Sequence, residues 1–336
     1  MFHITTLVYN PKVIFVCLIF NFSPLLLHAQ EPIKADTLIK KLDSLQLKAD
    51  SIPQQNEIRA SFYDENTKLT PRNYFILLGS NIKQEFTKPF HMKGKDFVKL
   101  GAFALSTVAM SFADEPLQRK SLALRNRSEN VRNAGKFISN FGLQYEIITL
   151  AAFGTYGVVF KSTKVKTVTL LATQAVVTGA IVSTVLKNLS GRTRPNYYGP
   201  LEHAEPSFRG PFADLGNSPG GQGSNSAFPS GHATLAFAAA TVFAVEYKNK
   251  PVIPIIAYSM ATLVGVSRIT ENKHWATDVF AGAILGYLTG RQVAYNYHRY
   301  AKIKNDEIRK LKKNTVKLLL NYNFGRPMPG IVWKFK

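Results

Sequence analysis

Three short motifs place basic, histidine and acidic residues at spacings that suit chemistry on a phosphate group. The first runs from Lys187 to Arg194-Pro195, the second is Pro229-Ser230-Gly231-His232, and the third joins Ser267-Arg268 to His274 and Asp278. Lysine and arginine side chains only donate hydrogen bonds, and the planar guanidinium of arginine matches two phosphate oxygens. Lys187, Arg194 and Arg268 are therefore candidates for a cradle that binds a phosphate.

The two histidines supply the groups that covalent transfer of a phosphoryl group requires. If the segment that contains them is helical, His274 and Asp278 lie one turn apart on the same face, and the carboxylate can accept a hydrogen bond from Nδ1. Nε2 of His274 is then free as the nucleophile, and His232 can protonate the leaving oxygen. Ser230 and the backbone N–H groups around Gly231, at a helix start, add donors for the phosphoryl oxygens. This chemistry requires neither a metal ion nor another cofactor.

Long apolar segments surround these motifs and predict an all-α fold, a six-helix membrane-type bundle. Each segment exceeds the usual length of a strand, and none alternates with a period of two. The segments cover residues 97–113, 141–160, 167–186, 233–247, 252–266 and 276–294. Residues 167–186 carry no charge and are long enough to cross a bilayer. Other segments are shorter or contain a charge such as Glu146, so a soluble all-helical bundle is the alternative.

The connections between helices predict where the motifs meet. Helices 233–247 and 252–266 are joined by only four residues, so they must be antiparallel. The start of the first helix, with His232, therefore lies beside the end of the second, with Arg268. Because the neighbouring helices alternate in direction in the same way, His274 and the other motif residues are expected at that end too. The active site is thus predicted at one end of the bundle.

In this order and spacing, the motifs resemble the complete tripartite signature of the type 2 phosphatidic acid phosphatase superfamily, over roughly residues 97–296. The superfamily includes lipid phosphate phosphatases, class A bacterial acid phosphatases and vanadium haloperoxidases. The resemblance implies that one set of residues binds the substrate phosphate, namely Lys187, Arg194, Ser230, Gly231 and Arg268. It also implies His274 as the phosphohistidine nucleophile, Asp278 as the residue that orients it and His232 as the general acid.

The rest of the chain divides where its composition changes. Residues 1–30 combine Lys12, an apolar stretch and the small residue Ala29, as in a signal peptide, and an uncleaved membrane anchor is the alternative. Residues 31–96 are predicted to be a polar spacer with short helices, residues 97–296 the six-helix phosphatase domain, and residues 297–336 a basic tail that can form a short β-hairpin. The only cysteine, Cys17, lies in the first segment, so neither a disulfide nor a thiolate site is expected.

The charge of the chain indicates an anionic partner. Its 336 residues include 42 Lys+Arg and 21 Asp+Glu, a formal net charge of +21, with 46% hydrophobic and only 19% charged residues. This composition excludes a disordered chain, and the length excludes a small scaffold that depends on disulfides. The basic residues in 301–314 are not interleaved with aromatic ones, so the basic tail is expected to contact a membrane surface and no nucleic acid.

The sequence therefore predicts a metal-independent phosphatase that hydrolyses a lipid phosphate or pyrophosphate in the bacterial envelope. The candidate substrates that the resemblance implies are undecaprenyl pyrophosphate, phosphatidylglycerophosphate, phosphatidic acid and lipid A phosphates. The alternative is a soluble exported acid phosphatase that acts on small phosphomonoesters, and a more distant one is a vanadate-dependent haloperoxidase. Carbonate extraction separates the first two, and halide oxidation that depends on vanadate identifies the third.

The basic residues also predict an orientation in the membrane. Basic residues at the end of the bundle opposite the motifs favour a cytoplasmic position for that end. The protein is therefore expected in the inner membrane with its active site facing the periplasm, and full export is the alternative. Six spans would put residues 31–96 in the cytoplasm, whereas a cleaved signal peptide would put them outside, so these two expectations conflict. Arg192 is interpreted as a positive helix flank or a peripheral phosphate contact, and the glycine-rich loop 210–226 as a flap over the site.

Overall fold

The computed structural model describes residues 69–142, 144–197, 199, 205–213, 223–313, 315–323 and 326–334, and it describes side chains only as far as residue 304. The predicted signal peptide or anchor, most of the predicted spacer and the middle of loop 210–226 lie outside these residues.

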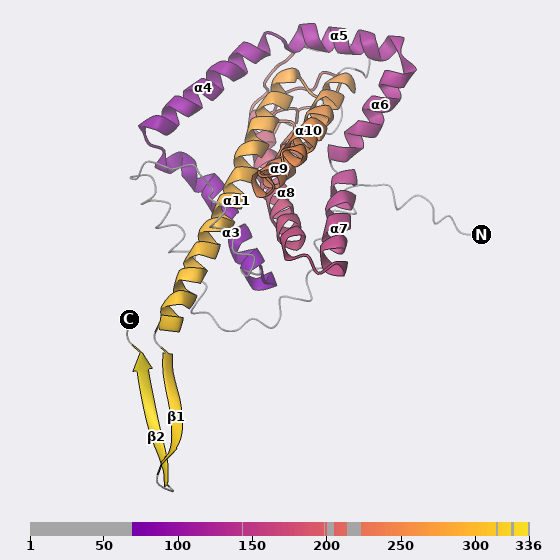
Figure 1. Cartoon of the computed structure of the whole chain (residues 1–336). Helices are drawn as coiled ribbons and strands as arrows, with labels where there is room; N and C mark the ends of the chain where they lie inside the picture. Colours follow the sequence, from indigo (N-terminus) through magenta and orange to yellow (C-terminus); the bar gives the residue numbers. More distant parts are fainter. Residues whose placement is uncertain are drawn as a thin grey trace, which may run out of the picture. The chain divides into compact units, whose positions relative to one another are not determined.

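Helices make up most of the described chain (Figure 1). They are α3 (Pro71–Thr87), α4 (Gly94–Ser111), α5 (Asp114–Arg127), α6 (Glu129–Ser139), α7 (Gln144–Val159), α8 (Thr163–Ser190), α9 (Gly231–Glu246), α10 (Val252–Thr270) and α11 (Ala276–Lys313), with the 3-10 turns η3 (Lys88–His91) and η4 (Asn140–Gly142). Strands β1 (Thr315–Asn323) and β2 (Arg326–Lys334) pair in an antiparallel hairpin. All six predicted segments are helical, so the all-α fold is confirmed, and α3, α5 and α6 are additional to them.

Local signals set the ends of the helices that carry the motifs. Helix α9 begins after Ser230, whose Oγ accepts a hydrogen bond from the N–H of Ala233 at 3.5 Å. Helix α8 ends at Gly191, which adopts the left-handed conformation with a φ of 55°. A Cβ atom there would also lie 2.1 Å from the carbonyl oxygen of Gly210. Only glycine therefore fits at the point where the chain turns from Lys187 toward Arg194.

Helix α9 lies at the centre of the bundle, in contact with α8, α10 and α11, and α7 packs on α8 (Figure 1). Its closest neighbour is α11, which presents glycines at every fourth position, Gly282, Gly286 and Gly290. A Cβ atom at these positions would lie between 2.2 and 2.6 Å from carbonyl oxygens of α9 or of Ser230 just before it. The missing side chains let the two helix backbones touch, as small residues do in membrane bundles. This contact fixes the start of α11 next to the start of α9.

Helix α3 lies within the predicted spacer, and buried amides join it to the bundle. Asn81 accepts a hydrogen bond from Asn296 at 2.6 Å and donates one to Gln174 at 3.3 Å. Gln84 accepts a second bond from Asn296 at 2.8 Å. Part of the predicted spacer is therefore packed against α8 and α11. The polar composition of α3 concealed this because, apart from Leu77, its buried side chains are polar and form hydrogen bonds.

Two described helices, α8 and α10, are long and apolar enough to cross a membrane. Helices α4 and α5 pass the same test only as a pair bent by 50°, and α9 is apolar but shorter. Large apolar side chains are exposed along α4, among them Phe97 at 59%, Leu105 at 74% and Phe112 just after its end at 80%. Such a surface suits contact with lipid better than contact with water. Among the described residues, fewer helices are therefore both long and apolar enough to cross a membrane than the six segments that the sequence predicted.

Candidate active site

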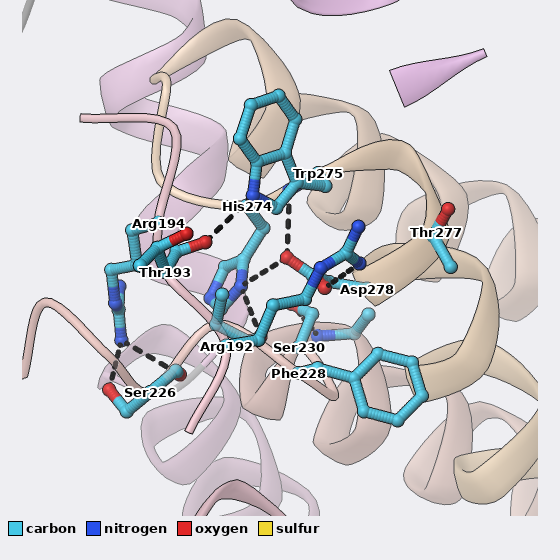
Figure 2. Close-up of polar contacts among 12 residues, drawn as sticks. Arg192, Thr193, Arg194, Ser226, Phe228, Ser230, His274, Trp275, Thr277 and Asp278 are labelled. Atoms are coloured by element: carbon cyan, nitrogen blue, oxygen red, sulfur yellow. Dashed lines mark hydrogen bonds and ion pairs between the residues drawn. The ribbon is translucent and has the colours of Figure 1, made fainter. Parts of the chain in front are cut away.

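The structure brings the eight predicted site residues together at one end of the bundle. Figure 2 labels Arg194, Ser230, His274 and Asp278 among them. The eight residues come from the end of α8 and the loop after it, the start of α9, the end of α10, and the loop and first turn that begin α11: Lys187, Arg194, Ser230, Gly231, His232, Arg268, His274 and Asp278. The side chain of His274 lies within electrostatic range of His232 and of all three predicted phosphate-binding cations. The convergence that the helix connections predicted is therefore present.

His274 is buried, and a backbone carbonyl fixes its imidazole ring. Nδ1 lies 2.8 Å from the carbonyl oxygen of Ala227, whereas Oδ2 of Asp278 is 3.6 Å away. Because a carbonyl oxygen can only accept, Nδ1 carries the proton and donates it, and Nε2 keeps its lone pair. The ring is thus held in the tautomer that a nucleophile requires.

This partner differs from the sequence prediction, in which the Asp278 carboxylate accepts the proton of Nδ1. Helix α11 begins at Ala276, so His274 precedes it and the helical spacing does not apply. The carboxylate also has other partners, because Oδ2 accepts the N–H of Trp275 at 2.8 Å and Oδ1 accepts from Arg192 at 2.6 Å. Asp278 therefore faces His274 as a nearby charge rather than as its hydrogen-bond acceptor.

The environment of His274 is strongly positive. Burial lowers the pKa of His274 well below its usual value, and the nearby positive charges of Arg194, Lys187 and Arg268 lower this pKa further. The imidazole is therefore neutral near pH 7, in agreement with the tautomer that the Ala227 carbonyl fixes.

Arg192 is part of a buried ion cluster and is not a helix flank, in contrast to the sequence interpretation. Its Nη1 donates to Oδ1 of Asp278 and its Nη2 to Oδ2 of Asp114, both at 2.6 Å. Figure 2 shows the guanidinium of Arg192 pointing at Asp278. Asp114, the first residue of α5, also accepts the backbone N–H and the hydroxyl of Thr277, each at 2.9 Å. Because two carboxylates bind both Nη atoms of its guanidinium, Arg192 does not fit the alternative interpretation as a peripheral phosphate contact either.

Two of the predicted phosphate-binding cations are held by serines. Nη2 of Arg194 donates to the hydroxyl of Ser226 at 3.1 Å and to its carbonyl oxygen at 3.4 Å. Nη1 of Arg268 donates to the hydroxyl of Ser139, at the end of α6. Serine hydroxyls orient a guanidinium without neutralising it.

The third cation lies beside the backbone at the start of α9. A Cβ atom on Gly231 would lie 3.2 Å from Nζ of Lys187, so the ammonium approaches the main chain where a side chain would stand. The adjacent Ser230 is fully buried, and its N–H donates to the carbonyl oxygen of Asp278 at 2.9 Å. The start of α9 is thus fastened to the start of α11.

Sequence reasoning missed several residues that shape this site. Trp275 is fully buried and donates its Nε1–H to the carbonyl oxygen of Thr193 at 2.8 Å, which ties the loop after α8 to α11. Lys273 adds another cation, and burial together with the charges of Arg194 and Arg268 lowers the pKa of Lys273. The positions of Lys273 and Trp275 on either side of His274 were the only signal for them. Asp114 had no signal at all, because it lies far from the motifs in the chain.

The arrangement defines a class of site in which a neutral, oriented histidine and a second histidine lie among three cations that suit a phosphate. Residues 167–302 match the model of the PAP2 superfamily, and this stretch contains all three motifs. The resemblance that the motifs indicate is therefore confirmed as a match to this family model over residues 167–302.

The chain is similar to proteins of known name over different lengths. The chain is 47% identical to a lipid A 1-phosphatase of Porphyromonas gingivalis over 73 residues, which is 21% of this chain and 16% of that protein. It is 28% identical to phosphatidylglycerophosphatase B of Bacillus subtilis over 200 residues, or 57% of this chain and 87% of that protein. The crystal structure of a transmembrane PAP2 type phosphatidylglycerolphosphate phosphatase from Bacillus subtilis aligns with a TM-score of 0.42 at 22% identity, over 62% of this chain and 94% of that one.

Proposed function

We propose that this protein is a metal-independent phosphatase that hydrolyses a lipid phosphate or pyrophosphate through a phosphohistidine intermediate on His274. The observation that carries the proposal is the 2.8 Å contact between Nδ1 of His274 and the carbonyl oxygen of Ala227. It leaves Nε2 unprotonated in a buried site that three cations surround. A neutral imidazole with a fixed ring is what nucleophilic attack on phosphorus requires.

In the first step Nε2 of His274 attacks phosphorus and the bond from phosphorus to the leaving oxygen breaks. Lys187, Arg194 and Arg268 spread the negative charge of the three equatorial oxygens, and the N–H groups at the start of α9 add donors. His232 gives a proton to the leaving oxygen. A bound phosphate brings negative charge next to His232, which favours the protonated imidazole that this role needs.

In the second step water attacks the phosphohistidine. His232, now neutral, accepts a proton from the water, the bond from Nε2 to phosphorus breaks, and inorganic phosphate leaves. The Asp278 carboxylate, 3.6 Å from Nδ1, stabilises the positive charge that the ring carries while it bears the phosphoryl group. Each proton and bond is thereby accounted for by residues of this chain and by water.

A lipid substrate is supported by the helices that surround the site. Helices α8 and α10, each long and apolar enough to cross a bilayer, end at the motifs Lys187 and Arg268. A lipid headgroup can then reach the cations while its tails stay among apolar surfaces. The names of the relatives agree, and the candidates are lipid A phosphates, phosphatidylglycerophosphate, phosphatidic acid and undecaprenyl pyrophosphate. We place the protein in the bacterial inner membrane with the active site toward the periplasm.

The experiment is a substrate panel with the purified, detergent-solubilised protein. The wild-type protein should release phosphate from at least one of the four lipids without added metal. His274→Ala should lower kcat by several orders of magnitude, and the exposed His91 provides a matched control in His91→Ala. Acid quenching should destroy the labelled phosphoenzyme and alkaline quenching preserve it, as expected of a phosphoramidate. No hydrolysis of any lipid, or full activity of His274→Ala, would overturn the proposal.

Carbonate extraction tests the alternative of a soluble exported acid phosphatase. The proposed membrane enzyme should stay in the pellet, and release into the supernatant with activity on small phosphomonoesters alone would favour the alternative. A protease-sensitive tag at residue 60, probed in spheroplasts, reports on which side of the membrane the predicted spacer, residues 31–96, lies.

A further inference from the structure

A buried cluster of charged side chains connects helix α5 to the active-site histidine. Asp114, Arg192 and Asp278 are each at most 2% exposed, and Arg192 contacts both carboxylates at 2.6 Å. None of the three motifs contains Asp114 as a member, and it lies before residues 167–302, the stretch that matches the superfamily. The cluster therefore reaches the site from a part of the chain that the motifs do not describe.

We propose that Asp114 and Arg192 are positioning residues for the phosphatase reaction, which hold the charge of Asp278 and the first turn of α11 in place behind His274. The inference rests on the proposed function, because it assigns a role to residues that support the nucleophile.

Arg192 acts on His274 through two routes. Its side chain engages Oδ1 of Asp278 while the N–H of Trp275 engages Oδ2, so the carboxylate stays 3.6 Å from Nδ1 and leaves the proton of Nδ1 to Ala227. Its carbonyl oxygen accepts the N–H of Ala227 at 3.0 Å, which fixes the residue that orients the ring. Loss of Arg192 contacts would therefore disturb both the charge behind His274 and its hydrogen-bond acceptor.

Asp114 completes the cluster from the opposite side. It binds the second nitrogen of Arg192 and also accepts the N–H and the hydroxyl of Thr277, in the first turn of α11. Two carboxylates at the start of α11 match the positive end of the helix dipole. Two carboxylates with one guanidinium leave one negative charge, which offsets the positive charge that the ring of His274 gains as its bond to phosphorus forms.

A purely structural role explains this cluster less well. Burying three charges is costly, and apolar residues of the same volume often replace such a cluster without loss of stability. The same charges assist catalysis when they lie beside a group whose charge changes during the reaction, because a water-free site strengthens their effect on it.

Two variants test the inference, Asp114→Asn and Arg192→Lys. The amide that replaces the Asp114 carboxylate would still accept from the N–H of Thr277 but would carry no charge, and a lysine can reach only one of the two carboxylates. Each variant should lower kcat by about 10²-fold while KM and the affinity for vanadate, a phosphate analogue, stay near the wild-type values, because the phosphate-binding cations are untouched. Glu115→Gln is the matched control and should be fully active, because it changes the neighbouring, half-buried side chain that pairs with Arg119 at 3.4 Å.

The measurements of kcat, vanadate affinity and thermal stability distinguish a positioning role from a merely structural one, and the choice of substrates separates this inference from the proposed function. A merely structural role predicts parallel losses of kcat, vanadate affinity and thermal stability, and that result would overturn the inference, as would wild-type kcat in both variants. If neither variant folds, Thr277→Val removes one hydroxyl and keeps both charges, and it should lower kcat at unchanged KM. The wild-type protein is assayed first on phosphatidic acid and p-nitrophenyl phosphate. Activity on the nitrophenyl ester alone overturns the lipid substrate but leaves the positioning test in place, and inactivity on both overturns the two proposals together.

Discussion

A methyl group added at Gly142 should displace His232, the proposed general acid, without changing the chemistry of its side chain. In Gly142→Ala, the new Cβ would lie 2.7 Å from Cδ2 and 2.8 Å from Cβ of His232, and 2.8 Å from Cγ1 of Val264. Carbon atoms in ordinary contact are at least about 3.4 Å apart, so His232 or the η4 turn must move by about 0.7 Å. His232 lies in the first turn of α9, which three other helices hold, so the turn and the ring share the shift.

The magnitude follows from the displacement. A misplacement of about 1 Å at a catalytic group costs about 10²-fold in rate, so a shift somewhat smaller than that should cost about 10- to 10²-fold. The overpacking itself should destabilise the protein by about 1–3 kcal/mol, which a well-folded bundle tolerates. The fall in rate should be pronounced only for substrates whose leaving group needs a proton from His232.

The assay compares two substrates whose leaving groups differ. An alkoxide that leaves from phosphatidic acid needs a proton, whereas p-nitrophenolate is stable without one. In Gly142→Ala, kcat/KM should therefore fall by about 10- to 10²-fold on phosphatidic acid and much less on p-nitrophenyl phosphate, since kcat/KM reports only the steps up to the phosphoenzyme. Gly101→Ala makes the same chemical change where no atom lies within 4 Å, and it should behave as wild type on both substrates.

Two results would refute the reasoning. A folded Gly142→Ala protein with wild-type kcat/KM on both substrates would show that His232 need not stand where it does. An equal loss on both substrates would mean that the methyl group disturbs the nucleophile or the cations rather than the acid.

The other predictions concern the charge and the protonation of the nucleophile's surroundings. Asp278→Asn removes a negative charge 3.6 Å from Nδ1 of His274. At an effective dielectric of about 20 this charge is worth at most about 4.6 kcal/mol to the positively charged phosphohistidine, and Arg192 partly offsets it. The kcat should therefore fall by about 10²- to 10³-fold with little change in KM, and a fall of less than tenfold in rapid-quench kinetics would contradict this. The second follows from the lowered pKa of His274: below about pH 6.5 the unfolded chain binds a proton that the folded chain does not, so this group favours unfolding as the pH drops. Thermal unfolding in phosphate-free buffer should therefore lose less stability on acidification in His274→Gln than in the wild type, and identical pH dependence would count against a buried neutral histidine.

The bundle and its motifs could be predicted from the sequence because their signals are local or periodic. Apolar segments of helical length located the six predicted helices, and a four-residue connection required α9 and α10 to be antiparallel. Residue types that suit phosphate chemistry, in three spaced motifs, then placed His232, Arg268 and His274 at one end of the fold. Hydropathy and spacing were sufficient for each of these steps.

The missed features depend on contacts between distant residues or on the backbone. The acceptor for His274 is a carbonyl oxygen of Ala227, and no pattern of side chains can encode a backbone partner. Arg192 was interpreted as a positive helix flank or a peripheral phosphate contact because it follows an apolar helix, and only its bond to the distant Asp114 reveals its position in a buried cluster. Helix α3 was assigned to a polar spacer because its buried face consists largely of polar side chains such as Asn81. Partners of this kind are visible only once the chain is folded.

The same contacts explain how a short set of motifs becomes a site. The motif residues lie on or beside α8, α9, α10 and α11, but several of them are held by elements that carry no motif. Gly142 of η4 packs on His232, Ser139 of α6 holds Arg268, and Asp114 of α5 holds Arg192 behind Asp278. The chemistry is thus supplied by the four helices that the superfamily match covers, whereas its geometry depends on the helices that precede them. Activity should therefore be sensitive to changes at Asp114, Ser139 and Gly142, which belong to none of the motifs.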